Sequence, residues 1–193
     1  MKNPDLRCFN PFTDRLSRDL RNDLSQSLLE ALTTGSSAPL LRVDAKYRNL
    51  PGLGDGRGHY LTERLACYHV VLSNTTDTRA NSDHIARLLW NHELFFEFHE
   101  LLEKRWLAAE GNEKLILQAL IRAAGVYILR QFDREAGAYK MAMRSREILI
   151  GIRETAPLGF SAEKLLAALS TSQGMPPKFD TTETTSCSCR HSH

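Results

Sequence analysis

One segment of the chain, residues 113–132, carries apolar side chains on almost every face when it is drawn as a helix. Such a helix must be covered all round by other elements, because apolar surface is driven out of water. The rest of the chain repeats apolar residues at helical spacing, and we find no alternating pattern typical of a strand. We therefore predict an all-α protein, a small helical bundle with residues 113–132 as its central helix.

Leucines recur at helical spacing near the start of the chain. They are Leu16, Leu20, Leu24, Leu28 and Leu32. Four-residue spacing places them on one face of a helix, and Thr13 is suited to cap its beginning. One short helix within 40–58 and another over 59–72 complete an N-terminal helical segment, residues 13–72, which follows an irregular lead-in over residues 1–12. The sequence does not indicate how this segment docks on the rest.

A polar linker, residues 73–83, separates the N-terminal segment from a helical domain over residues 82–170. The predicted helices of this domain are one that begins near Ser82 and the segments 92–110, 113–132, 134–150 and 162–170. After the domain, residues 172–193 combine prolines with many serines and threonines and contain few apolar groups. Such a composition cannot bury a core, so we expect a disordered C-terminal tail.

Composition restricts the possible partners. The 193-residue chain has a formal net charge of only +2, which gives no basic surface for nucleic acid. Its longest apolar run, residues 115–129, is shorter than the roughly 20 residues that a membrane span needs. We see no secretory signal, and the four cysteines suggest no disulfide framework, so we expect a cytoplasmic protein. The expected partner is a small molecule or a protein, with no nucleic acid, no membrane and no cofactor.

A glycine-rich stretch, GLGDGRG at residues 52–58, invites comparison with a phosphate-binding loop. It follows no predicted strand, and it lacks the Gly-Lys-Ser/Thr ending whose side chains contact phosphate and Mg²⁺. We therefore interpret this stretch as a flexible connector between two helices.

The segment 92–110 concentrates side chains that can do chemistry. At 100° per residue, one stripe about 120° wide collects both histidines, several aromatic residues and one glutamate. These residues are His92, Phe95, Phe96, His99, Leu102, Glu103 and Trp106. Three other glutamates, Glu93, Glu97 and Glu100, fall on the opposite side, where we expect them to be exposed. Glu103 is predicted to be buried, and a buried carboxylate needs a partner.

His99 and Glu103 are four residues apart, so their side chains can meet on one helix face. Gln118 and Arg122 have the same spacing in the central helix. A connection of only a few residues around Gly111 would make these two helices antiparallel neighbours. We therefore predict a polar cluster of the four side chains inside the apolar interface between the two helices.

These residues resemble a known family, the domain-of-unknown-function family 309, over about residues 85–150. The shared pattern is His99-x3-Glu103-x2-Trp106 after the aromatic FFEF, then Gln118-x2-Ile121 and the later REAGAYKMAMRS. Two positions depart from the family pattern, because Ala119 stands for the usual glycine and Arg122 for the usual glutamine. The resemblance implies a small all-α domain and no settled activity.

The sequence leaves several functions open for this cluster. His99, Glu103 and Arg122 could form a structural brace with Trp106 packed over them. Alternatively, the cluster could bind a ligand or a protein partner, or belong to an uncharacterised hydrolase-like enzyme in which His99 or Glu103 is the base. The N-terminal segment could also pack on the domain and cover such a pocket. The candidate ligand-binding residues are Phe96, His99, Glu103, Trp106, Gln118 and Arg122.

A metal-dependent enzyme is a further alternative. The sequence HELLE differs from the zinc-protease pattern HExxH in having Glu103 in place of the second histidine. The candidate ligands there are His92, His99 and Glu103, an incomplete set, so we expect no metal centre. A second weak set, without the spacing of a folded zinc module, lies in the tail: Cys187, Cys189, His191 and His193.

Overall fold

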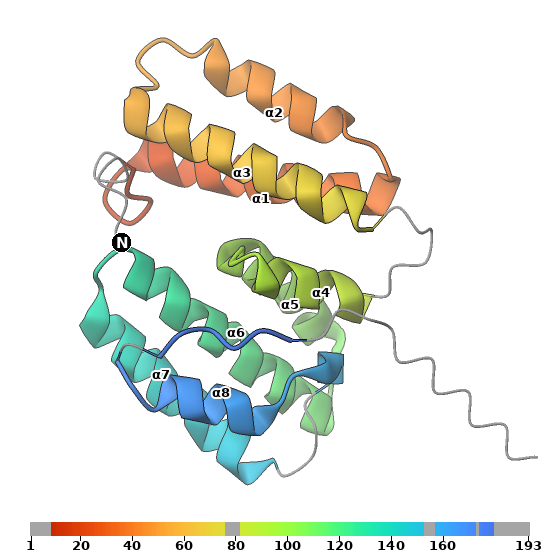
Figure 1. The fold of residues 1–193 in the computed structure, drawn as a ribbon, viewed down its shortest axis with the longest axis vertical. Helices are drawn as coiled ribbons and strands as arrows, with labels where there is room; N and C mark the ends of the chain where they lie inside the picture. Colours follow the sequence, from red (N-terminus) through yellow and green to blue (C-terminus); the bar gives the residue numbers. More distant parts are fainter. Residues whose placement is uncertain (1–8, 76–81, 153–156, 173, 180–193) are drawn as a thin grey trace, which may run out of the picture.

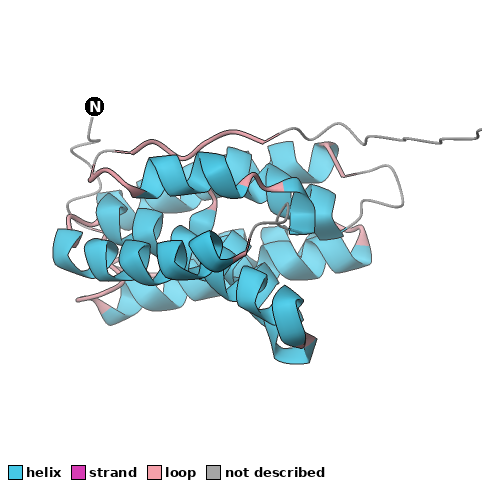
Figure 2. Ribbon diagram, turned by 90° about the horizontal axis from the view of Figure 1, so that it is seen from below, coloured by secondary structure: helices cyan, strands magenta, loops and turns pink. Residues whose placement is uncertain are grey.

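Helical periodicity is realised throughout the part of the chain that the computed structural model describes, which is residues 9–75, 82–152, 157–172 and 174–179. These residues form eight α-helices and one short 3₁₀ helix, with no β-strand among them (Figure 2). The predicted all-α fold is therefore confirmed. Helices built on local apolar spacing need only short connections, and the helices follow one another along the chain without long irregular segments in between.

The N-terminal helices are α1 (Arg15–Thr34), α2 (Ala38–Arg48) and α3 (Asp55–Ser73). The later ones are α4 (Ser82–Asn91), α5 (Phe95–Ala108), α6 (Gly111–Gln131), α7 (Glu135–Gly151), the 3₁₀ helix η2 (Pro157–Gly159) and α8 (Ala162–Leu169). Figure 1 shows α1, α2 and α3 on one side of the molecule, α4 and α5 in the middle, and α6, α7 and α8 on the other side. Every helix predicted from the sequence is present.

Local signals set the ends of the N-terminal helices. Asp14, rather than the predicted Thr13, caps α1, because its carboxylate accepts a hydrogen bond of 2.8 Å from the Ser17 amide. Gly54 precedes α3 with a φ of 75°, a backbone conformation that favours glycine. The glycine-rich connector is therefore shorter than predicted, since α3 already begins at Asp55.

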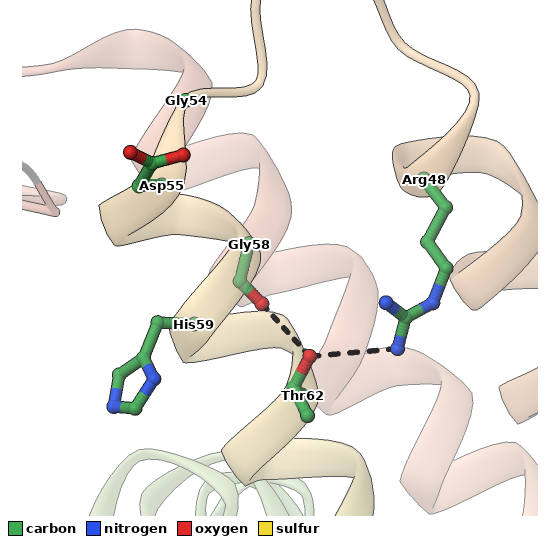
Figure 3. A pocket seen from close by; sticks show the side chains of 6 residues that line it. All are labelled: Arg48, Gly54, Asp55, Gly58, His59 and Thr62. Carbon is green, nitrogen blue, oxygen red and sulfur yellow. Dashed lines mark hydrogen bonds between the residues drawn. The ribbon is translucent and has the colours of Figure 1, made fainter.

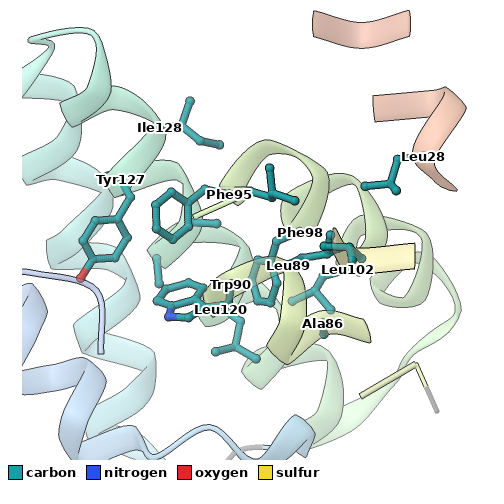
Figure 4. Packing of buried hydrophobic residues seen from close by; sticks show 14 of the residues in the cluster. Leu28, Ala86, Leu89, Trp90, Phe95, Phe98, Leu102, Leu120, Tyr127 and Ile128 are labelled. Atoms are coloured by element: carbon teal, nitrogen blue, oxygen red, sulfur yellow. The ribbon is translucent and has the colours of Figure 1, made fainter. Parts of the chain in front are cut away.

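The antiparallel packing of α5 and α6 is confirmed. Trp106 near the end of α5 lies under the Lys114 ammonium near the start of α6. The opposite ends also meet, since the rings of Phe95 and Tyr127 stack at 4.9 Å. The helix α6 is buried on most of its faces, as its sequence predicts. Around it, Trp90 forms the centre of an aromatic core with Phe95, Phe98 and Tyr127 (Figure 4).

The helix α7 packs closely on the other side of α6. The buried Ser145 hydroxyl donates a hydrogen bond of 2.8 Å to the Ala119 carbonyl. Gly125 is buried and faces α7, since Met141 lies against it.

Part of the predicted disordered tail is ordered. Residues 174–179 run back along the domain. The Asn91 side-chain amide donates a hydrogen bond to the Phe179 carbonyl, and the Asn91 side-chain oxygen accepts one from the Phe179 amide. The Phe179 ring is buried beside Phe160, and the Trp90 indole donates a hydrogen bond to the Pro177 carbonyl. The prediction of disorder from residue 172 is therefore wrong for residues 174–179, because a buried aromatic ring and several hydrogen bonds anchor the segment. Residues 180–193 lie outside the described residues.

Candidate functional site

The helix α5 is covered on two sides. Phe95, Phe98 and Leu102 are buried against α4 and α6. On another side α5 faces α1 and α3, and there the Glu97 carboxylate is completely buried. Two predictions are therefore wrong: Glu97 is buried instead of exposed, and Glu103 is exposed instead of buried.

The error has a geometric cause. At 100° per residue, the stripe through Phe95, Phe98 and Leu102 is rotated by about 60° from the predicted stripe. That rotation brings Glu103 to the surface. Glu97 lies far from both stripes and becomes buried only because α1 and α3 dock on α5, which the spacing within α5 could not reveal.

Glu97 has two partners on α3. The Tyr68 hydroxyl donates a hydrogen bond of 2.5 Å to Glu97 Oε1, and Arg64 Nη1 lies 3.7 Å from Glu97 Oε2. Tyr60, one turn before Arg64, is buried in a ring stack with Phe9. We call Glu97, Tyr60, Arg64 and Tyr68 the Glu97 cluster. Sequence reasoning missed it, although the four-residue spacing of its α3 members was an available signal.

Electrostatics keep the α3 partners of Glu97 in their protonated forms. Burial and the Glu97 carboxylate together raise the pKa of the Tyr68 phenol well above its usual value, so Tyr68 remains a hydrogen-bond donor. For Arg64, burial is the largest influence and lowers the pKa, but Glu97, Tyr60 and Tyr68 together outweigh it, and the net effect is a rise. The cluster is therefore a fixed ionic contact between α3 and α5.

The predicted candidates on α5 lie on a partly exposed face that the Glu97 cluster does not use. Phe96, His99 and Trp106 are partly buried there, and Glu103 is exposed. We call these four residues the α5 face. Two ring nitrogens on it, His99 Nδ1 and Trp106 Nε1, are inaccessible to solvent and have no hydrogen-bond partner among the described residues.

Charged groups from neighbouring residues border the α5 face. The Arg21 guanidinium of α1 lies 3.8 Å from the centre of the Phe96 ring. The Lys114 ammonium of α6 lies 5.0 Å from the centre of the Trp106 ring. His99 Nδ1 is 3.5 Å from Glu100 Oε1, which is too long for a good hydrogen bond. The contact with His99, opposed by burial and helped by Arg21 and Lys104, still lowers the pKa of Glu100.

The predicted four-residue polar cluster does not form as expected. The Arg122 guanidinium donates to the Arg144 carbonyl on α7 at 3.4 Å. No ion pair between Arg122 and Glu103 occurs among the described residues, and Gln118 is only partly buried in α6. The reason is that the side of α6 bearing Arg122 also faces α7, while Glu103 points to solvent.

The structure changes which residues make up one of the two predicted groups of metal ligands. His99 and Glu103 lie together with Glu100, and one potential ligand atom from each lies within 4.8 Å of the others. His92, the predicted third member, is exposed and is not in this group. The tail candidates Cys187, Cys189, His191 and His193 lie outside the described residues.

An open pocket lies away from the α5 face, between the end of α2 and the start of α3 (Figure 3). Arg48, Gly58 and Thr62 line it with Gly54, Asp55 and His59. The pocket does not restore a phosphate-loop interpretation of the glycine-rich stretch, because its polar groups bind one another. Arg48 is paired with Asp44 at 2.6 Å, and the Thr62 hydroxyl donates to the Gly58 carbonyl.

Comparison with known proteins tests the family resemblance. No curated protein and no solved structure matches the chain. Among the described helices, none combines the length and the apolar character that crossing a membrane requires. One family model does match, over residues 85–141, which include α5, α6 and the whole α5 face. The predicted resemblance is thus confirmed, since this part of the chain matches the model of the family described as Domain of unknown function (DUF309).

Proposed function

We propose that the protein is a binding protein, and that its ligand or partner segment docks on the α5 face, Phe96, His99, Glu103 and Trp106. The observation that carries this proposal is a pair of buried ring nitrogens: Trp106 Nε1 has no hydrogen-bond partner, and His99 Nδ1 has only the long 3.5 Å contact with Glu100 Oε1. Buried polar atoms are almost always hydrogen-bonded, so two exceptions on one face need an explanation. A bound molecule with hydrogen-bonding groups supplies one.

The structural-brace alternative loses its support at these residues. A brace would need Glu103 to be buried and paired with Arg122, but Glu103 is exposed and Arg122 bonds to α7. The bracing role between helices falls instead to Glu97, held by Tyr68 and Arg64. The predicted brace therefore does not account for the polar atoms of the family-pattern residues His99, Glu103 and Trp106.

The neighbouring groups indicate what kind of ligand fits. The indole Nε1–H of Trp106 is a donor only, so its partner must be an acceptor such as a carbonyl or carboxylate oxygen. The rings of Phe96 and Trp106 offer apolar surface to the same molecule. Lys114 lies over Trp106 and is a flexible side chain that a ligand can displace. An apolar body that carries an oxygen acceptor, such as a small carboxylate or a short peptide, meets these requirements.

A hydrolase-like role for His99 or Glu103 has less support. Catalysis by this pair would need a substrate-sized recess beside it. The pocket shown in Figure 3 is lined by residues of α2, α3 and the turn between them, so it offers no such recess to His99 and Glu103. Binding without a reaction is therefore the function that we propose.

The proposal is tested by substituting Trp106 with phenylalanine, which keeps an aromatic ring but removes the donor. The full-length protein is screened by thermal shift, in EDTA, against small carboxylates, amides and short peptides. We expect Trp106→Phe to weaken binding of any hit about tenfold, the value of one neutral hydrogen bond. Its melting temperature should stay close to that of the original protein, because the lost donor had no partner within the chain.

A matched control is Tyr139→Phe, which removes a polar atom from an exposed aromatic residue on α7. It should change neither melting nor binding. The proposal fails if no compound raises the melting temperature, or if every hit binds Trp106→Phe and the original protein equally well.

A further inference from the structure

Three metal-ligating side chains converge at one edge of α5. One ligand atom each from His99, Glu100 and Glu103 lies within 4.8 Å of the others. His99 and Glu103 share one helix face because they are four residues apart, and Glu100 reaches them from the adjacent side of the helix. The set mixes one imidazole with two carboxylates, which is a ligand combination that zinc accepts.

We propose that His99, Glu100 and Glu103 bind a divalent transition-metal ion, for which Zn²⁺ is the probe. This inference deepens the proposed function and rests on it, because the ion would lie on the α5 face and would offer the docked molecule a strong contact for its oxygen acceptor. Three protein ligands leave at least one coordination position open for that oxygen.

The distance between His99 and Glu100 supports a shared ion. Nδ1 and Oε1 are 3.5 Å apart. An N–H···O hydrogen bond would be shorter, at roughly 2.9 Å. Two ligands placed about 2.0–2.1 Å from one tetrahedral ion are about 3.3–3.4 Å from each other. The observed separation is closer to the second geometry.

The remaining ligand can adapt to the ion. Glu103 is exposed, so its carboxylate can move toward His99 and Glu100 without disturbing the core. Arg21 and Lys104 lie near Glu100, and their positive charges oppose a cation. We therefore expect micromolar rather than nanomolar affinity.

The ligand types also decide which ions compete. Imidazole nitrogen suits zinc, copper, nickel and iron, whereas Mg²⁺ and Ca²⁺ are bound through oxygen. Millimolar Mg²⁺ should therefore leave Zn²⁺ in place. Displacement of Zn²⁺ by Mg²⁺ would show a site of carboxylates alone and would overturn the assignment of His99.

The experiment is a calorimetric Zn²⁺ titration of the full-length chain. All samples carry serine or alanine at Cys187, Cys189, His191 and His193, so that the tail cannot bind the ion. We expect one equivalent of Zn²⁺. Both His99→Ala and Glu103→Gln should weaken it by at least ~10-fold, since even the loss of an outer-shell partner costs that much. His92→Ala is the matched control, because this exposed histidine lies outside the cluster, and it should leave binding unchanged.

Two safeguards keep the result interpretable. Glu103→Gln changes an exposed side chain and should not affect folding, which a thermal melt verifies. If His99→Ala destabilises the protein, His99→Gln replaces it. Saturable Zn²⁺ binding that is absent, or that is lost equally with His92→Ala, would overturn the metal site. The proposed function would survive that outcome, because its screen is carried out in EDTA and depends on Trp106.

Discussion

At the scale of single residues, Glu97 bears the largest electrostatic burden in the described structure. Its side chain is completely buried, and an ionised carboxylate in such a place costs several kcal/mol unless it is paired and hydrogen-bonded. Tyr68 provides the hydrogen bond and Arg64 provides the charge. Oε2 still has no hydrogen-bond partner among the described residues. The two partners therefore only just offset the free-energy cost of burying this carboxylate. Removing either partner should destabilise the folded protein strongly.

We predict that Tyr68→Phe destabilises the protein by about 2 kcal/mol, because it removes a hydrogen bond to a buried charge and keeps the ring. The melting temperature should fall by roughly 4–8 °C for a chain of this size. Tyr139→Phe, at an exposed tyrosine, should stay within about 0.5 kcal/mol. Equal melting temperatures for the two variants would contradict the importance of the Glu97 cluster.

The second prediction for a single residue concerns Asp14 and the pH dependence of the protein's stability. The Ser17 hydroxyl and amide, helped by Arg57 and opposed by burial, lower the pKa of Asp14 from 3.8 to about 2. A lowered folded-state pKa adds stability that is complete above the unfolded value, 3.8, and is lost as the pH falls toward 2. We expect ionised Asp14 to contribute about 1 kcal/mol to the free energy of unfolding, because its carboxylate is a third exposed and solvent screens it.

The measurement compares the original protein with Asp14→Asn in urea melts between pH 6 and pH 3. Asparagine still caps the helix but does not titrate in this range. The stability difference should be constant at the upper end and should shrink as the pH falls below about 4. A difference that is independent of pH would show that Asp14 acts only as a neutral cap.

At the scale of the elements, the sequence indicates where helices lie better than which faces they bury. Start and stop signals are local: Ser161 caps α8 through a hydrogen bond from the Lys164 amide, and the helix lies where its sequence predicts. The burial of α6 was also predictable, because nearly all its faces are apolar. The segment 174–179 was missed, since a single aromatic residue, Phe179, anchors it after a polar stretch.

The helix α5 shows why the candidate site could be predicted only in part. Its aromatic residues and histidines suggested the right helix, and Phe96, His99 and Trp106 do share a partly exposed face. The buried face could not be assigned, because α5 is covered by α1 and α3 as well as by α4 and α6. Docking between segments far apart in sequence leaves no periodic signal in either of them, so the burial of Glu97 was not foreseeable from α5 alone.

At the scale of the whole molecule, the N-terminal helices and the family domain share one core. Residues of both belong to a single apolar cluster, in which Leu28 of α1 lies near Phe98 and Leu102 of α5 (Figure 4). The Glu97 cluster adds an ionic contact across the same boundary. A boundary that is crossed by both apolar and ionic contacts should not open on its own, so we predict that the described helices unfold together in one cooperative transition.

Two spectroscopic probes test this prediction, because both tryptophans, Trp90 and Trp106, lie after the linker. Their fluorescence reports on the family domain, whereas far-UV circular dichroism reports on all helices, including α1, α2 and α3. The two melting curves should coincide in the original protein. They should also shift together in Tyr68→Phe, since a change on α3 can reach Trp90 only through the shared core. If the circular dichroism midpoint moves and the fluorescence midpoint does not, the N-terminal helices are a separate folding unit, and their contact with α5 contributes little to the stability of the family domain.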